Sequence, residues 1–335
     1  MIKKYKSNEK GIALMAVLWV LVILIALATE FAYSMKMEVN TTRNYKENAE
    51  SYYLSKAGIN LALAELFKAA RFHSIHEEHG WVIGNILPMS TETQLPFTTT
   101  TQDRNKQNFT IQDFDIVNRT NIELKNGTVT YTIQDENGKI SINSANKNTL
   151  NKLLEFSGVE DKIEQNTISD SILDWIDADK NHRLNGAEDD YYRKQNPPYF
   201  AKNGEIETFD DLLKIHGMTK EILYGSKDKV DEDKKYKGII NHLTIYKIPT
   251  VNPNTASKEV LDVLFEPEQV NTILKNIYSK GFHSNTLSNF FRIKSTGKIT
   301  GSSTEHSVEV VVEKSVTDGK PKMVIHYWND NALGS

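Results

Sequence analysis

The densest group of potential metal ligands lies between Asp174 and Asp190, in the stretch DWIDADKNHRLNGAEDD. Six of its 17 residues carry carboxylates, whereas only Lys180 and Arg183 are basic. Carboxylates held close together repel one another, so a folded loop this acidic needs a cation in order to pack. Carboxylate and carbonyl oxygens are the ligands that Ca²⁺ prefers. The sequence therefore predicts a calcium loop, against the simpler alternative of a solvated acidic surface loop.

The oxygen-bearing residues follow the spacing of an EF-hand calcium loop when they are numbered from Asp177. They fill its first, third, fifth, seventh, ninth and twelfth positions: Asp177, Asp179, Asn181, the Arg183 carbonyl, Asn185 and Glu188. The sixth position, normally a glycine in a sharp turn, is His182, so we expect a calcium loop and not a true EF-hand pair. Asp189 and Asp190 are surplus to one site and could begin a second. The expected cofactor is thus one or two Ca²⁺ ions.

Composition limits the other chemistry that this chain could carry. Its 335 residues contain no cysteine, which excludes disulfides, thiol catalysis and thiolate metal sites. The net charge of −4 offers no attraction to nucleic acid. No nucleophile elbow, P-loop or dinucleotide fingerprint occurs in the sequence. We therefore expect a non-enzymatic protein that does not bind nucleic acid.

The acidic loop and the rest of the chain follow a long apolar segment near the N-terminus. Residues 11–29 carry no charge and are preceded by four basic residues: Lys3, Lys4, Lys6 and Lys10. Past residue 29 the chain has no Pro or Gly until Gly58, and a stripe recurs every three or four residues: Tyr52, Ser55, Ile59, Leu63, Leu66 and Ala70. This pattern predicts one helix over residues 12–70, about 90 Å long, with a transmembrane part at 12–32. The basic leader keeps the first residues in the cytoplasm. The alternative is a secretory signal cleaved after Ala28.

The residues at the start of this helix carry a family resemblance. A basic leader ending in Gly11, followed by IALMA (residues 12–16), resembles the N-terminus of type IV pilins and pseudopilins. In that family a prepilin peptidase cuts after the glycine, which implies a leader of residues 1–11 and processing between Gly11 and Ile12. Most members have Glu at the fifth position of the processed chain, but here this position is Ala16. That exception resembles the K-type minor pseudopilins of type II secretion systems, which sit at the filament tip.

The rest of the chain predicts strands on both sides of a helical block. Asn126-Gly127 between two extended runs indicates a β-hairpin with Val129, Tyr131 and Ile133 on one face. Leucine-rich helical spacing covers 143–176, 206–223 and 250–278, and strand patterns return at 290–301, 306–314 and 322–328. Residues 71–108 have the composition of a loop. These patterns predict an α+β fold in which a long helix packs on an antiparallel sheet that carries an inserted α domain.

The K-type resemblance supplies an organisation and a function as expectations. It implies a first part of the β domain at 71–140, an inserted α domain at 141–287 and the last strands at 288–335. It further implies a structural subunit at the pseudopilus tip that supports protein export across the outer membrane, anchored once in the bacterial inner membrane with its bulk in the periplasm. Its partners would be I- and J-type minor pseudopilins and the prepilin peptidase. The implied calcium ligands are Asp177, Asp179, Glu188 and Asp189.

Two other functions remain open from the residues alone. The turns at Gly158 and Gly217 resemble helix-hairpin-helix modules, which would suit a pilin-anchored DNA-binding protein of the competence type. Glu160 and Thr219 stand where such a module has its second glycine, which favours packing over phosphate binding. The second alternative is an anchored or secreted hydrolase that uses the acidic loop as a metal site. A zinc cluster of His73, His76, Glu77 and His79 is less favoured than a polar helix end.

Overall fold

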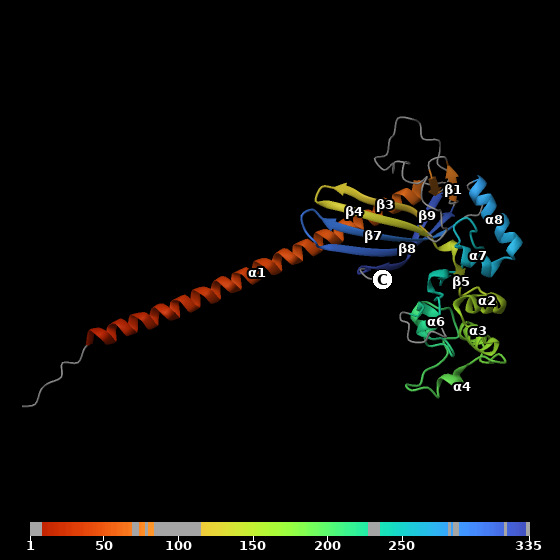
Figure 1. The fold of residues 1–335 in the computed structure, drawn as a ribbon, viewed down its shortest axis with the longest axis horizontal. Coiled ribbons are helices and arrows are strands. Elements are labelled where there is room, and N and C mark those ends of the chain that lie inside the picture. The colour runs from red at the N-terminus through yellow and green to blue at the C-terminus, as the bar shows by residue number, and fades with distance from the viewer. Residues whose placement is uncertain are drawn as a thin grey trace, which may run out of the picture.

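One helix dominates the shape of the molecule. The computed structural model describes residues 9–68, 74–77, 80–83, 115–226, 235–280, 283, 288–317 and 320–332. Helix α1 (Glu9–Lys68) is 60 residues long, and its N-terminal half projects away from the remainder as a free rod (Figure 1). Residues 13–39 are exposed along its whole circumference, including the apolar run. Within the described residues this is the one helix long and apolar enough to cross a membrane.

The C-terminal half of α1 is buried on one face because its small and apolar residues recur every three or four positions. The buried residues of this stripe are Ser51, Leu54, Ser55, Gly58, Ile59, Ala62 and Leu66. They pack against valines and aromatic residues of an antiparallel sheet. Glu47 fixes the start of this contact by accepting hydrogen bonds from the hydroxyls of Ser302 (2.7 Å) and Thr304 (3.0 Å). Helix and sheet therefore share one hydrophobic core.

The sheet has five antiparallel strands in the order β3-β4-β7-β8-β9. Their bounds are β3 (Asp115–Leu124), β4 (Gly127–Asp135), β7 (Phe290–Ile299), β8 (Glu305–Thr317) and β9 (Lys320–Asn329). Alternation along β4 buries Val129, Tyr131 and Ile133 under α1, as the sequence predicted. The predicted hairpin at Asn126-Gly127 is also confirmed, since Leu124 pairs with Gly127.

A helical domain is inserted between two neighbouring strands of this sheet. Asp135 at the end of β4 pairs with Phe291 near the start of β7, although more than 150 residues separate them. The inserted helices are α2 (Lys147–Ser157), α3 (Lys162–Ile176), α4 (Asp189–Tyr192), α5 (Phe209–Leu212), α6 (Lys220–Tyr224), α7 (Lys258–Leu264) and α8 (Pro267–Lys280). They enclose a second, separate core at the end of the molecule opposite the N-terminus of α1 (Figure 1). The predicted α+β fold is confirmed.

Short elements complete the helical domain and the far end of α1. The inserted domain also contains two 3₁₀ turns, η2 (Glu136–Gly138) and η3 (Ile240–His242), and the short parallel pair β5 (Ile140–Ser141) and β6 (Leu243–Thr244). Strands β1 (Ser74–Glu77) and β2 (Gly80–Ile83) pair as a hairpin. The expectation of a loop throughout 71–108 is thus wrong for these strands. The side chains of the candidate zinc cluster lie outside those that the structure describes.

Buried polar groups join the two ends of the inserted domain where it leaves the sheet. The Asp135 carboxylate accepts hydrogen bonds from Ser288 Oγ (2.5 Å) and Thr255 Oγ1 (2.7 Å). It also accepts one from Asn252 Nδ2 at 3.0 Å. Burial raises the pKa of Asp135, and these donors oppose that effect. Because donors from two further segments, 252–255 and Ser288, share the carboxylate at the end of β4, the junction is held as a single unit.

Candidate metal centre

The acidic loop is anchored at both ends by aromatic packing. It begins at the end of α3, where Asp177 is the C-cap, and it leads into α4 at Asp189. The rings of Trp175 and Tyr192 meet edge to face with their centroids 5.2 Å apart. Trp175 also packs against Tyr199, at 6.4 Å between centroids. Both ends of the loop therefore belong to the buried core of the helical domain, which fixes the backbone from which the carboxylates project.

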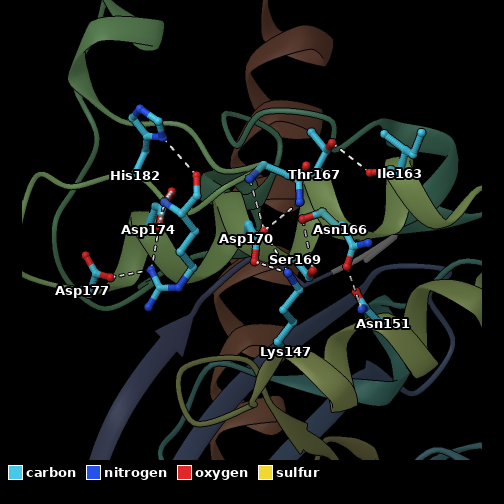
Figure 2. A network of polar contacts seen from close by, with 12 residues as sticks. Lys147, Asn151, Ile163, Asn166, Thr167, Ser169, Asp170, Asp174, Asp177 and His182 are labelled. Carbon is cyan, nitrogen blue, oxygen red and sulfur yellow. Dashed lines mark hydrogen bonds and ion pairs between the residues drawn. The ribbon is translucent and has the colours of Figure 1, made fainter.

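Asp174 organises the middle of the loop. Its side chain is fully buried, and its Oδ2 accepts a hydrogen bond from the backbone N–H of Arg183 at 3.0 Å. The guanidinium of Arg183 then donates through Nη1 to Asp174 Oδ1 (2.5 Å) and to Asp177 Oδ2 (2.6 Å). Figure 2 labels the two aspartates and marks their contacts by dashed lines. Gly186 passes so close that a Cβ there would overlap Asp174 Oδ2. The loop is thus wrapped around one buried carboxylate.

Glu188 is a buried carboxylate whose oxygens have no hydrogen-bond partner among the described residues. The residue is 2% exposed, and both of its side-chain oxygens are unpaired. Burial, followed by the charges of Asp174, Asp177 and Asp189, raises the pKa of Glu188 to about 7. Asp177 Oδ1 is likewise buried without a donor. Leaving ionised oxygens buried and unpaired is costly unless a cation coordinates them. The donor set, all hard oxygens, fits Ca²⁺.

The structure brings together only part of the set predicted from the sequence. Asp177 and Asp189 both lie close enough to Glu188 for their charges to raise its pKa. Asp189 is half-buried, and its carboxylate accepts hydrogen bonds from Ala201 N (3.1 Å) and Lys180 Nζ (3.3 Å). By contrast, Asp179, Asn181 and Asp190 are exposed. Asp179 Oδ1 accepts from the backbone N–H of Asn181 at 2.8 Å, so that carboxylate is used in a local turn.

The EF-hand geometry is absent from the described loop for a local reason. The tight turn falls at Leu184-Asn185, where Gly186 N donates to Arg183 O at 3.0 Å, and not at the sixth position occupied by His182. Asn185 is thereby directed to Asp170, with its Nδ2 3.3 Å from Asp170 Oδ2. Among the residues that the structure describes, no three His, Asp or Glu side chains stand in a ready metal-ligating arrangement.

Two buried acids of α3 contribute to the site but were missing from the predicted ligands. Asp174 lies at its centre, and Asp170 holds the far side through Lys147 Nζ, 2.7 Å from its Oδ1 (Figure 2). Both precede the EF-hand-like spacing, so that pattern passed over them. A signal was present in the sequence, since Asp170, Asp174 and Asp177 are spaced four and three residues apart and so share one face of a helix.

The hairpin turns considered for DNA binding are packed inside their own domain. Gly158 (φ 105°) and Gly217 (φ 86°) both take the left-handed conformation that favours glycine. A Cβ at Gly217 would meet Ile168 of α3. The neighbours of Gly158, Ser157 and Val159, are buried. These contacts account for both turns as packing elements.

Comparisons with known proteins lead to the same family that the N-terminal residues resemble. Residues 120–225 match the family model described as type II secretion system (T2SS), protein K. A putative type II secretion system protein K of Escherichia coli strain K12 is 24% identical over 230 residues, covering 64% of this chain and 60% of that protein. The type II secretion system protein K of Klebsiella pneumoniae is 24% identical over 224 residues, covering 63% and 59%. The match thus spans about 60% of the length of these relatives.

A solved structure shows the same fold. The chain superimposes with a TM-score of 0.54 and 15% identity on a chain in the crystal structure of the GspK-GspI-GspJ complex from the enterotoxigenic Escherichia coli type 2 secretion system. The superposition covers 86% of this chain and 98% of the other. The resemblance to K-type proteins inferred from the sequence is therefore confirmed.

Proposed function

We propose that this chain, whose residues 120–225 match the protein K family of type II secretion systems, is a structural minor pseudopilin at the pseudopilus tip that supports protein export across the outer membrane. The observation that carries the proposal is α1. One half of this helix is apolar and fully exposed, while the other half is docked on the sheet. A helix that was only a cleaved signal would not continue without interruption into the core of the folded domain.

The exposed half of α1 suits a single pass through the inner membrane. Residues 13–29 are apolar and uncharged, and they cover most of a hydrocarbon core about 30 Å thick. The leading lysines place the N-terminus in the cytoplasm and the remainder of the chain in the periplasm. Burial of a carboxylate in this segment would be costly without a cationic partner. Ala16 avoids that cost, which suits a subunit with no neighbour ahead of it.

Processing by a prepilin peptidase would remove residues 1–11 and expose Ile12 as the new N-terminus. Intact mass spectrometry of the membrane-extracted chain tests this proposal. Loss of residues 1–11 supports it, whereas loss of residues 1–28 would identify a cleaved signal and overturn the retained helix. The variant Gly11→Val should keep the full-length mass. Gly204→Ala, a glycine change far from the cut where a Cβ makes only ordinary contact, serves as its control for processing.

The partners of the tip subunit would be I- and J-type minor pseudopilins. The superimposed structure is a complex that contains GspI and GspJ beside GspK. On this chain, the exposed aromatic residues Tyr45 (74% exposed) and Tyr53 (67%) lie on α1 away from the sheet and offer a surface for other pilin helices. The inserted domain lies at the end of the molecule far from the N-terminus of α1, where its bulk would block addition of a further subunit.

Co-purification tests the assignment directly. Full-length chain, co-expressed with the I- and J-type minor pseudopilins of the same organism and extracted in detergent, should elute with both as one complex. Tyr45→Asp with Tyr53→Asp should weaken the complex, while Glu123→Gln on the exposed edge of β3 should leave it intact. Elution of the wild-type chain alone would contradict the proposal.

Calcium would complete the acidic loop. Asp177, Glu188 and Asp189, with Asp174 beside them, would hold one ion, and Asp179, Asn181 and Asp190 remain the candidates for a second. Bound calcium would neutralise the unpaired carboxylates and stabilise the domain in proportion to its binding. We expect calcium to raise the melting temperature of the full chain above its value in EDTA. Asp177→Ala with Glu188→Ala should abolish that rise, and an unchanged rise would exclude these ligands.

A further inference from the structure

Arg183 occupies the position in which a cation would be most favourable. Its Nη1 lies 2.5 Å from Asp174 Oδ1 and 2.6 Å from Asp177 Oδ2, so one nitrogen bridges two carboxylates. The side chain of Asp174 is fully buried, whereas that of Arg183 is 38% exposed. The guanidinium therefore reaches inward from the surface and can leave along the same path. Its contacts are those of a removable counterion.

The arginine satisfies only part of the negative charge. Within the part of the chain that the structure describes, no donor reaches either oxygen of buried Glu188 or Oδ1 of Asp177. The guanidinium contacts Asp174 and Asp177, while Glu188, whose pKa is raised by burial and by the charges of both, receives no hydrogen bond from it. A guanidinium is monovalent and carries its donors in a fixed plane. A compact divalent ion has no such directional limit. The site retains oxygens for which the arginine offers no donor.

We infer that Arg183 is an internal substitute cation that holds the acidic loop together without metal and must withdraw when Ca²⁺ binds. This inference rests on the calcium site proposed above. Ca²⁺ and the guanidinium cannot share Asp174 and Asp177, because two positive charges at that spacing repel strongly in a partly buried site. Binding is therefore an exchange of one cation for another, and Arg183 lowers the affinity for the ion while keeping the metal-free loop folded.

The rest of the loop permits this exchange without unfolding. The backbone N–H of Arg183 donates to Asp174 independently of the side chain, so the turn is retained when the guanidinium leaves. Asn185 is likewise held by Asp170, outside the region that the guanidinium occupies. At Asp174 and Asp177 only the Arg183 side chain has to move, since the exposed Lys180 pairs with Asp189 instead.

Neutral variants of Arg183 separate the two effects. Arg183→Ala removes the competing charge, and Arg183→Gln keeps a polar side chain should the alanine variant fold poorly. Lys194→Ala is the matched control, because it removes an exposed positive charge of the same domain outside the acidic loop. The full chain in detergent is stripped with EDTA, dialysed and titrated with CaCl₂ by calorimetry, and its melting temperature is recorded with and without the metal.

We expect both Arg183 variants to bind calcium about tenfold more tightly than wild type, the order of effect for removing one adjacent positive charge. Their melting temperatures should fall in EDTA and return to the wild-type value in saturating calcium. The Lys194 control should shift neither quantity by as much. Unchanged affinity in the Arg183 variants, with normal binding by wild type, would overturn the exchange but leave the calcium site standing.

Two further outcomes are decisive. Binding by the Arg183 variants alone would support the substitute-cation role while refuting calcium as a ligand of the natural chain. Absence of binding in all variants would overturn both the exchange and the calcium site, without bearing on the pseudopilin assignment, which the partner co-purification tests separately.

Discussion

Gly58 of α1 lies directly against Ser295 of β7, with no space for a side chain between helix and strand. A Cβ at position 58 would overlap Ser295 Oγ and Val129 Cγ1. From the other side, a Cβ at Gly297 would collide with the α1 backbone at Ser51. Glycines on both elements thus allow the two backbones to approach closely, and this contact sets how α1 is seated on the sheet.

Enlarging Gly58 should separate helix and sheet. We expect Gly58→Val to destabilise the sheet domain by about 1–3 kcal/mol, as for other overpacked cores. The control is Asn60→Val at an exposed position of the same helix, which introduces the same β-branched residue without a collision. Thermal unfolding of the two variants measures the difference. Equal melting temperatures would show that the helix accommodates the added side chain by shifting.

Removing the carboxylate at the domain junction should be costly. Asp135→Ala leaves the buried donors of Asn252, Thr255 and Ser288 without their acceptor. We expect a loss of about 2–4 kcal/mol, because each unsatisfied buried donor carries a desolvation penalty. Glu123→Ala on exposed β3 is the control and should change stability little. Urea unfolding measures both, and equal midpoints for the two variants would contradict this role.

Buried Lys314 should give the sheet domain a distinctive pH dependence. Its Nζ donates to the Leu66 carbonyl in the last turn of α1 at 2.7 Å, and burial lowers the pKa of Lys314 to about 8. The unfolded lysine titrates near 10.5. Between these values the unfolded state binds the extra proton, so the stability of the wild-type chain rises with pH, by at most about 1.4 kcal/mol per unit.

The variant Lys314→Met removes this titration and should flatten the rise. The melting temperature of the wild type minus that of the variant is then expected to increase from pH 8 to pH 10. Lys322→Met, at an exposed position of β9, controls for loss of a surface charge and should follow the wild-type curve. Parallel curves for wild type and Lys314→Met would exclude the buried lysine as the source.

A comparison of two aspartates decides where calcium sits. The EF-hand-like spacing predicts that Asp179 is a ligand, whereas the folded loop places Asp174 at the centre. We expect Asp174→Asn to lower the metal-free melting temperature and reduce the stabilisation by calcium, because it weakens the packing around which the loop is built. Asp179→Asn, exposed in the described loop, should preserve the metal-free melting temperature and lose at most the part of the calcium stabilisation that a second ion supplies. The opposite result would favour the ligands predicted from the EF-hand-like spacing.

Periodic elements were predictable because their signal is local. Alternation of Val129, Tyr131 and Ile133 with polar residues was enough to identify β4 and its buried face. On α1, the predicted stripe included Ser55, Ile59 and Leu66, which are buried, as well as Tyr52 and Leu63, which are half-buried. The helix was expected over 12–70 and is described over Glu9–Lys68. Such patterns depend only on which side chains face a common core.

The conformation of the acidic loop was less predictable because it depends on contacts between residues that lack a fixed period. Spacing alone cannot show that Arg183 contacts two aspartates, nor that the turn forms before Gly186. The β1–β2 hairpin was missed for a related reason, since its segment mixes turn formers and polar residues with few of the alternating apolar residues that mark a strand.

The stretch of α1 between Glu30 and Glu47, which precedes the first contact with the sheet domain, has a mechanical consequence. With residues 13–29 in a membrane as proposed, this stretch holds that first contact about 25 Å above the bilayer surface. Because the helix is continuous through it, each residue inserted or deleted there would rotate the domain by about 100° around the helix axis as well as change its height. The length of α1 therefore sets the direction in which the sheet and helical domains face around the helix axis. A four-residue deletion, close to one full turn, should disturb assembly far less than a two-residue deletion.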